Sequence, residues 1–191
     1  MKFMAMSLLV VLFGGLAVLA APAPVAGSVV IVYSSRYGST AQTAEWIAAG
    51  MEGQATVVAA KDAADLSGYE KVVLGSGIYN GSLHADMAAF LEKRGAEVKD
   101  RIVALFVVCG MPPEQAGEYL EMFAVQSQAK PQLTRAFNGW MKKEILNPED
   151  FKGLEEYYKG AGYPFENYDR TDKAKCLEFA KEILAKIDAV K

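Results

Sequence analysis

The segment between residues 34 and 40 gathers side chains that suit the binding of an anion. Its residues are Ser34, Ser35, Arg36, Tyr37, Gly38, Ser39 and Thr40. Hydroxyl groups, a glycine that permits a tight turn and backbone amides ahead of a predicted helix all favour an anionic ligand. The lysine of an ATP-type phosphate loop and the glycine spacing of a dinucleotide turn are absent. The sequence therefore predicts a phosphate site of another type.

Alternating strands and helices must position this segment. Residues 28–34 form a short apolar run, typical of a strand that is buried on both faces of a parallel sheet. The remaining pattern predicts strands at 54–60, 71–75 and 101–108 and, less regularly, at 132–137, with helices at about 40–51, 84–95, 112–127 and 174–189. A further helix begins at Asn147-Pro148. This alternation indicates an α/β fold of three layers around a doubly wound parallel sheet.

Residues 31–47 resemble the N-terminal signature of the flavodoxin family. The resemblance implies a flavodoxin-like sheet of five parallel strands in the order 2-1-3-4-5, with noncovalent FMN used for electron transfer. It also implies that the loop holds the FMN phosphate, chiefly through Ser35, Arg36, Tyr37, Ser39 and Thr40. The Arg36 side chain either adds a charge-assisted contact or points to solvent.

The same resemblance implies that two further loops contact the flavin ring. The first contains Ser76, Gly77, Ile78, Tyr79, Asn80 and Gly81. Tyr79 is the candidate for stacking on the ring, and a surface tyrosine is the alternative. The second contains Cys109 and Gly110, without the acidic residue and second aromatic ring that electron-carrying flavodoxins usually place there. Cys109 either lies near the flavin edge or is a buried small hydrophobic residue.

Residues 68–91 look like the oxygen-independent protoporphyrinogen dehydrogenase branch of this family. In that branch the protein oxidises a porphyrinogen and passes electrons through FMN to a quinone, and a segment is added before the last helix. Residues 139–172 are such a segment here. Its aromatic residues are Trp140, Phe151, Tyr157, Tyr158, Tyr163, Phe165 and Tyr168. They either build a pocket wall or pack an extra helix onto the sheet.

Composition limits the other classes of function. A net charge of -3, with scattered lysine and arginine, argues against a nucleic-acid partner. Two distant cysteines, Cys109 and Cys176, and a single histidine, His84, do not form a metal-binding motif. His84 begins a predicted helix, where it either approaches the flavin or faces solvent.

The N-terminal residues carry their own prediction. Residues 4–26 contain no charged side chain, Lys2 precedes them, and Pro22 and Pro24 lie near their end. This pattern predicts that residues 1–27 are a signal peptide, with an uncleaved membrane anchor as the alternative. Residues 28–191 are then one domain that is exported to the periplasm or anchored at the membrane, or cytoplasmic if an anchor faces inward.

Three functions fit these patterns. The first is an FMN oxidoreductase with a small-molecule substrate, such as a porphyrinogen or quinone. The second is an electron carrier that docks on a redox partner protein, against which the acid-free loop at Cys109 argues. The third is a non-redox binding module on the same fold, against which the complete phosphate loop argues.

Overall fold

The computed structural model describes residues 29–189, so the predicted signal peptide or anchor lies outside the described residues. In these residues the main sheet of the protein contains six strands: β1 (Val29–Ser34), β2 (Ala55–Ala59), β3 (Lys71–Tyr79), β4 (Ser82–Leu83), β5 (Ile102–Cys109) and β6 (Leu133–Asn138). The order is β2-β1-β3-β5-β6, all parallel, and β4 pairs antiparallel with β3. The predicted order of the five parallel strands is confirmed.

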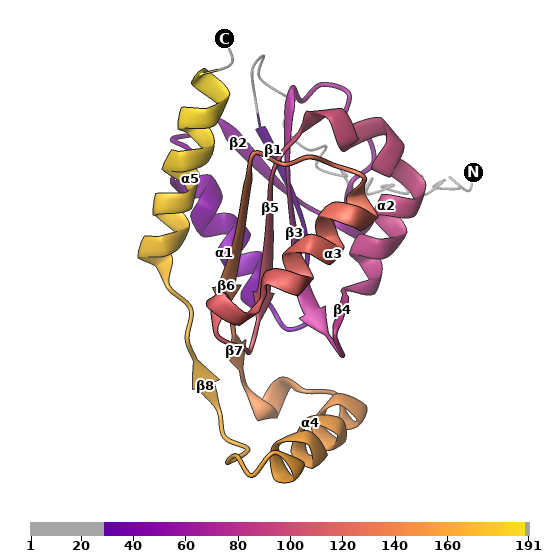
Figure 1. The fold of residues 1–191 in the computed structure, drawn as a ribbon, viewed down its shortest axis with the longest axis vertical. Coiled ribbons are helices and arrows are strands. Elements are labelled where there is room, and N and C mark those ends of the chain that lie inside the picture. Colours follow the sequence, from indigo (N-terminus) through magenta and orange to yellow (C-terminus); the bar gives the residue numbers. More distant parts are fainter. Residues whose placement is uncertain (1–28, 190–191) are drawn as a thin grey trace, which may run out of the picture.

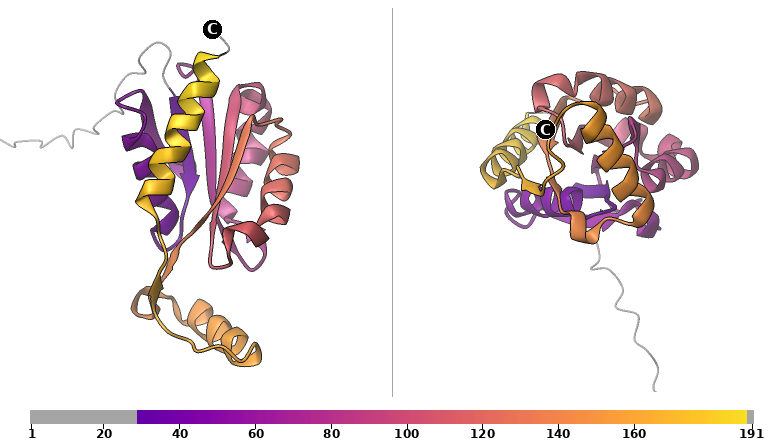
Figure 2. Two further views of the ribbon diagram at one scale, coloured as in Figure 1. Left: turned by 60° about the vertical axis from the view of Figure 1, so that its left-hand side comes forward. Right: turned by 90° about the horizontal axis from the view of Figure 1, so that it is seen from below.

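Two helices cover each face of the sheet (Figures 1 and 2). They are α1 (Ser39–Ala49) and α5 (Lys173–Asp188) on one face, and α2 (Ala85–Val98) and α3 (Gly117–Ser127) on the other. Successive residues of a strand point to opposite faces, so each buried strand contributes to both cores. In β1, Val30 and Val32 pack on the α2 side, whereas Val29 and Ile31 pack on the α1 side. The three-layer prediction is confirmed.

Strand β3 is longer than the prediction of 71–75, because its glycines do not end it. Pairing with β1 and β5 continues through Ser76 and Gly77. A Cβ atom at Gly75 would lie 2.0 Å from the Phe106 ring, so this glycine makes room for a core aromatic side chain. Residues 76–79, predicted to lie in a loop, therefore belong to a strand.

The chain turns back after β3 through Asn80 and Gly81. Both residues have positive φ, 48° and 75°, as a tight hairpin turn requires. The turn leads into β4, where Tyr79 pairs with Ser82 and Ile78 with Leu83. Asn-Gly is a strong hairpin signal in a sequence, and it explains why this loop is shorter than predicted.

The remaining connections contain short 3₁₀ turns. These lie at Ala60–Asp62, Lys99–Arg101, Pro113–Gln115 and Lys143–Ile145. The helix expected from Pro112 therefore begins at Gly117, after a separate turn. Within residues 29–189, no helix is both long enough and apolar enough to cross a membrane.

The predicted added segment leaves the sheet after β6. It consists of β7 (Trp140–Met141), α4 (Pro148–Gly160) and β8 (Tyr168–Asp169), with β7 and β8 paired antiparallel. The views in Figures 1 and 2 place α4 beyond the carboxyl ends of the parallel strands. We call residues 139–172 the insertion.

A small aromatic core holds the insertion together. The ring of Phe165 lies 5.2 Å from that of Phe151 and 5.6 Å from that of Tyr158, measured between centroids. The side chain of Asn147 caps α4 by accepting from the Asp150 amide at 2.8 Å, and Pro148 occupies the first turn. Some of the insertion's aromatic residues thus pack on one another rather than on the sheet.

Candidate functional site

The structure brings the three predicted loop segments to one edge of the sheet. In the register of the parallel strands, Ser34 lies opposite Ser76, and Gly77 lies opposite Val108. Residues 34–40, 76–81 and 109–110 therefore meet where the strands end. In open α/β sheets this edge, at the point where the strand order reverses, is the usual ligand site.

The loop that joins β1 to α1 offers donors to an anion. Gly38 has φ of 93°, and its amide donates to Ser35 Oγ at 3.0 Å, which fixes the turn. Helix α1 begins at Ser39 without a side-chain cap on its first amides. Thr40 Oγ1 is buried and has no hydrogen-bond partner among the residues that the structure describes. A group with several oxygen atoms, such as a phosphate, fits this set of donors.

Two predicted site residues form a buried link between strands. Ser34 Oγ and Ser76 Oγ lie 3.3 Å apart, and both residues are buried. Ser76 Oγ also donates to the Gly77 carbonyl at 2.9 Å and accepts from the His84 amide at 3.0 Å. These hydroxyls fix the ends of β1 and β3 below the loop.

Tyr79, the candidate stacking residue, lies against the loop that joins β1 to α1. The Arg36 amide donates to Tyr79 Oη at 2.9 Å, and the Arg36 guanidinium lies 4.8 Å from the centre of the tyrosine ring. Burial raises the pKa of Tyr79, and hydrogen bonds from the amides of Arg36 and Tyr37 oppose that rise. The ring is therefore not a free surface ring, and its stacking on a flavin stays a prediction.

His84 is buried rather than exposed to solvent. It caps α2, because its Nδ1 accepts from the Asp86 amide at 3.1 Å. Burial lowers the pKa of His84, since it disfavours the charged imidazolium. Its ring centre lies 5.3 Å from that of Tyr79 in an edge-to-face arrangement. The His84 ring therefore packs against the Tyr79 ring and helps to hold it in place.

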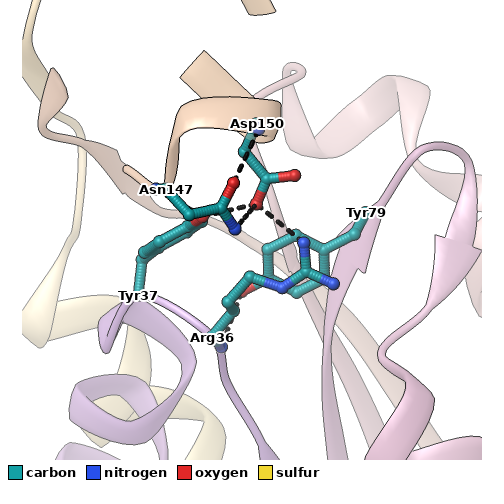
Figure 3. A network of polar contacts seen from close by, with 5 residues as sticks. All are labelled: Arg36, Tyr37, Tyr79, Asn147 and Asp150. Carbon is teal, nitrogen blue, oxygen red and sulfur yellow. Dashed lines mark hydrogen bonds and ion pairs between the residues drawn. The ribbon is translucent and has the colours of Figure 1, made fainter. Parts of the chain in front are cut away.

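Asp150, on the first turn of α4, connects the insertion to the loop (Figure 3). Its Oδ2 accepts from Arg36 Nη1 at 2.7 Å and from Asn147 Nδ2 at 3.2 Å. The Tyr37 hydroxyl donates to the same oxygen of Asp150. The backbone amide of Asn147 donates in turn to the Tyr37 hydroxyl at 3.3 Å. Arg36 therefore neither points freely to solvent nor keeps its charge for a ligand alone.

The electrostatics favour an ionised Asp150. Burial by itself would raise the pKa of this carboxyl, but hydrogen bonds from Tyr37 and Arg36 outweigh burial and hold the pKa below its usual range. Burial raises the pKa of Tyr37, and its bond to Asp150 adds to the rise. At neutral pH the network contains a carboxylate, a neutral phenol and a guanidinium cation.

Trp140 makes a second contact between the insertion and the loop. Its Nε1 donates to the Tyr37 carbonyl at 2.9 Å. A Cβ atom at Gly38 would lie 3.1 Å from Trp140 Cζ2, so the indole packs directly on the loop backbone. Lys142 Nζ lies 4.3 Å above the same ring. The loop is thus held between its own strand and a wall built by the insertion.

The third loop segment contains no reactive thiol. Cys109 is buried, its Sγ donates weakly to the Met111 carbonyl at 3.8 Å, and burial raises its pKa. A Cβ atom at Gly110 would lie 2.6 Å from Tyr168 Oη, so this tyrosine of the insertion fills the space beside the glycine. Within residues 29–189, no cluster of His, Cys, Asp or Glu side chains could hold a metal ion.

Three residues at this edge were not apparent as site residues from the sequence: Trp140, Asn147 and Asp150. The helix start at Asn147-Pro148 was visible in the sequence, but its contact with a loop more than a hundred residues earlier was not. Trp140 was visible only as one of seven aromatic residues in the insertion. A tryptophan directly after the last strand of the sheet was the available signal.

Comparisons with known proteins agree with this fold. The family model of the flavodoxin domain matches residues 30–164. Oxidised flavodoxin 1 from Bacillus cereus has 20% identity and a TM-score of 0.55, covering 83% of this chain and 97% of its own. A flavodoxin from the domain Archaea has 18% identity and a TM-score of 0.54, with coverages of 84% and 99%.

A larger protein contains a similar domain. The flavodiiron core of Flv1 from Synechocystis has 14% identity and a TM-score of 0.54 over 87% of this chain, but the match covers only 37% of that protein. No curated protein sequence matches the chain. At these identities the solved structures establish the fold, and the family model establishes the family.

Proposed function

Because the chain belongs to the flavodoxin domain family, we propose that it is an FMN-dependent oxidoreductase with a small-molecule substrate of its own. Family membership makes FMN its cofactor and electron transfer its chemistry. The observation that carries the finer proposal is the insertion, which lies against the phosphate loop through Trp140 and Asp150. A wall at this position suits a ligand pocket, whereas a carrier that docks on proteins needs an open face around the flavin.

We assign the FMN phosphate to the loop Ser35–Thr40. The unpartnered Thr40 hydroxyl and the uncapped start of α1 support this assignment, because both can donate to phosphate oxygens. The candidates for the flavin side are Ile78, Tyr79, Asn80, Gly81, Cys109 and Gly110, on the neighbouring strand ends. FMN supplies the redox chemistry, and these residues hold it, orient it and exclude water.

The proposed substrate pair is a porphyrinogen as electron donor and a quinone as acceptor. The insertion supports this proposal, since its own aromatic core holds α4 together and Asp150 and Trp140 hold the insertion against the loop. Tyr157 and Tyr163 are 67% and 66% exposed and offer further apolar area at its surface. The site contains no free thiolate and no exposed histidine, so the chain is expected to bind and orient rather than to attack the substrate.

Stopped-flow reduction tests the proposal. The full-length, FMN-loaded protein is mixed separately with protoporphyrinogen and with a reduced flavodoxin reductase, and bleaching of the visible flavin band is followed. Fast, saturable bleaching by protoporphyrinogen, with reoxidation by a quinone, is the expected result. Bleaching by the reductase alone would contradict it, and a protein that binds no FMN would favour the non-redox module.

An electron carrier is the second candidate. Its support is size, because the structural match covers 97–99% of two flavodoxins and the chain therefore spans nearly the whole fold of each. On this alternative the insertion is a docking surface for a redox partner protein. The same stopped-flow comparison separates the two functions, because the carrier is reduced by the reductase and not by the porphyrinogen.

Location is a separate proposal. We propose that residues 1–27 direct the domain to the periplasm or anchor it at the membrane, where quinones are available. N-terminal sequencing of the protein recovered from each cell fraction tests this. A mature N-terminus near residue 28 supports cleavage, an intact N-terminus in the membrane fraction supports an anchor, and an intact protein in the cytoplasm contradicts both.

A further inference from the structure

We propose that Tyr79 is an internal competitor for the anion site, whose hydroxyl takes the place of a phosphate oxygen and must leave when a phosphate enters. The inference rests on the proposed function in one respect, namely that the ligand carries a phosphate group. It adds a role that the sequence did not indicate for Tyr79. The residue would set how tightly the loop holds any phosphorylated ligand.

The first line of support is the hydrogen bonding of the Tyr79 hydroxyl. The Arg36 amide, one of the loop donors expected to face a phosphate, donates to Tyr79 Oη at 2.9 Å. The Tyr37 amide and the Ser35 side chain also act on this hydroxyl, because both oppose the rise in its pKa. The Tyr79 oxygen therefore accepts from a backbone donor of the loop as an oxygen of a bound anion would.

The second line of support is the position of the ring. A Cβ atom at Gly77 would lie 2.7 Å from Tyr79 Cε2 and 3.0 Å from Tyr79 Oη. The same point is 3.0 Å from Thr40 Oγ1, the buried hydroxyl that has no partner among the described residues. The tyrosine thus reaches the base of the loop, and it does so only because Gly77 has no side chain. It leaves Thr40 unsatisfied.

Neighbouring groups hold Tyr79 in this position. The Arg36 guanidinium lies over its ring, and the rings of Tyr37 and His84 approach it edge-on at 6.3 and 5.3 Å between centroids. Asp150 holds the Arg36 guanidinium at 2.7 Å. The insertion therefore supports the inward position of Tyr79 through Arg36.

A phosphate has the advantage in this competition. It has more acceptor oxygens than a tyrosine hydroxyl, and its charge makes each hydrogen bond stronger. It can also satisfy Thr40. The observed affinity is nevertheless reduced by the fraction of molecules in which Tyr79 occupies the loop. Because the ring cannot lie in the loop and stack on a flavin at once, displacement by the phosphate would release it for stacking.

Phosphate binding to the full-length, cofactor-free chain tests the inference. Inorganic phosphate is titrated while the amide resonances of Arg36 and Thr40 are followed by NMR, in the wild type and in Tyr79→Phe. The variant keeps the ring and removes the competing hydroxyl, so we expect phosphate to bind about threefold to tenfold more tightly. The control is Tyr163→Phe, at an exposed position, for which no change is expected.

The outcomes separate this inference from the proposed function. Equal phosphate affinity in Tyr79→Phe and the wild type, or an Arg36 amide resonance that the variant does not shift in the absence of ligand, overturns the inference. If the variant does not fold, the wild type still decides, because phosphate must shift the Tyr79 ring resonances together with the Arg36 amide. A chain that binds phosphate competitively with Tyr79 but reacts with no porphyrinogen retains the inference and loses the proposed function.

Discussion

The phosphate loop and the insertion meet at one edge of the sheet, yet they depend on contacts of different range. The loop is fixed by its neighbours, as in the bond from the Gly38 amide to Ser35 three residues earlier. The insertion reaches the loop through Trp140 and Asp150, from positions more than a hundred residues away. On the proposed function, the loop would bind the cofactor phosphate and the insertion would control access to the cofactor, so that mutations could change the two separately.

The largest effect is expected from the loop itself. Gly38→Ala forces a side chain into φ of 93° and against Trp140, so we expect FMN to bind about thirtyfold more weakly, or worse. Fluorescence titration with FMN measures this. Gly53→Ala is the matched control: its φ is 84° but no atom lies near its added Cβ, so the strain is similar and the FMN affinity should not change.

A smaller effect is expected from the first contact of the insertion. Trp140→Phe removes the hydrogen bond to the Tyr37 carbonyl while keeping an aromatic ring, and we expect a loss of about fivefold in FMN affinity. Limited proteolysis should also cleave the insertion faster. Trp46→Phe, on α1 away from this edge, serves as the control. Unchanged affinity and unchanged cleavage would show that the insertion does not support the loop.

The second contact of the insertion, made by Asp150, is expected to have the opposite effect on FMN affinity, because its loss should strengthen binding. Asp150→Asn removes a negative charge beside the site and frees Arg36, so FMN should bind about twofold to threefold more tightly while the insertion becomes easier to cleave. Calorimetry and proteolysis measure the two effects. Glu149→Gln, an exposed neighbour on the same turn, is the control. Weaker FMN binding in Asp150→Asn would contradict the expectation that Asp150 draws the charge of Arg36 away from the ligand.

Low pH should also weaken the contact between Asp150 and Arg36 in the wild-type protein. The pKa of Asp150 is lower in the folded chain than its ordinary value of 3.8. The ionised carboxylate therefore contributes its full stabilisation of the fold above pH 3.8, and this stabilisation is lost as the pH falls through the lower folded pKa. Near-ultraviolet circular dichroism, which reports on Trp140, should change in that range in the wild type and not in Asp150→Asn. The same transition in both proteins would assign it to another group.

The smallest effect is expected at Cys109. Its thiol is buried with a raised pKa, so Cys109→Ala should lower the free energy of unfolding by about 1 kcal/mol and leave the rate of flavin reduction unchanged. Chemical denaturation and the stopped-flow assay measure both. A changed rate of flavin reduction would give this cysteine a redox role that its surroundings do not indicate.

The range of the contacts also explains which features the sequence could predict. The strand order, the three layers and the loop from Ser34 to Thr40 depend on local hydrophobic runs and on a local signature, and they could be predicted. The extension of β3 to Tyr79 could not be predicted from its glycines, because pairing with β1, β5 and β4 decided it. The Asn80-Gly81 pair is a local signal for a hairpin turn. It could be recognised as a hairpin only once β3 was known to extend to Tyr79.

The site residues divide in the same way. The sequence predicts Tyr79 at this edge of the sheet, but its inward position depends on Gly77 and on Arg36, which Asp150 holds from another element. The contact between Ser34 and Ser76 was likewise not apparent from the sequence. Tertiary contacts, which one sequence does not display, decided each of these cases.

Paired titration of the cofactor-free, full-length chain with FMN and with riboflavin tests the central claim most directly. The two ligands share the flavin ring and differ in the phosphate. The account predicts that FMN binds at least about a hundredfold more tightly, because only its phosphate can engage the loop from Ser35 to Thr40. Equal affinities for the two ligands would contradict the assignment of this loop as the phosphate site.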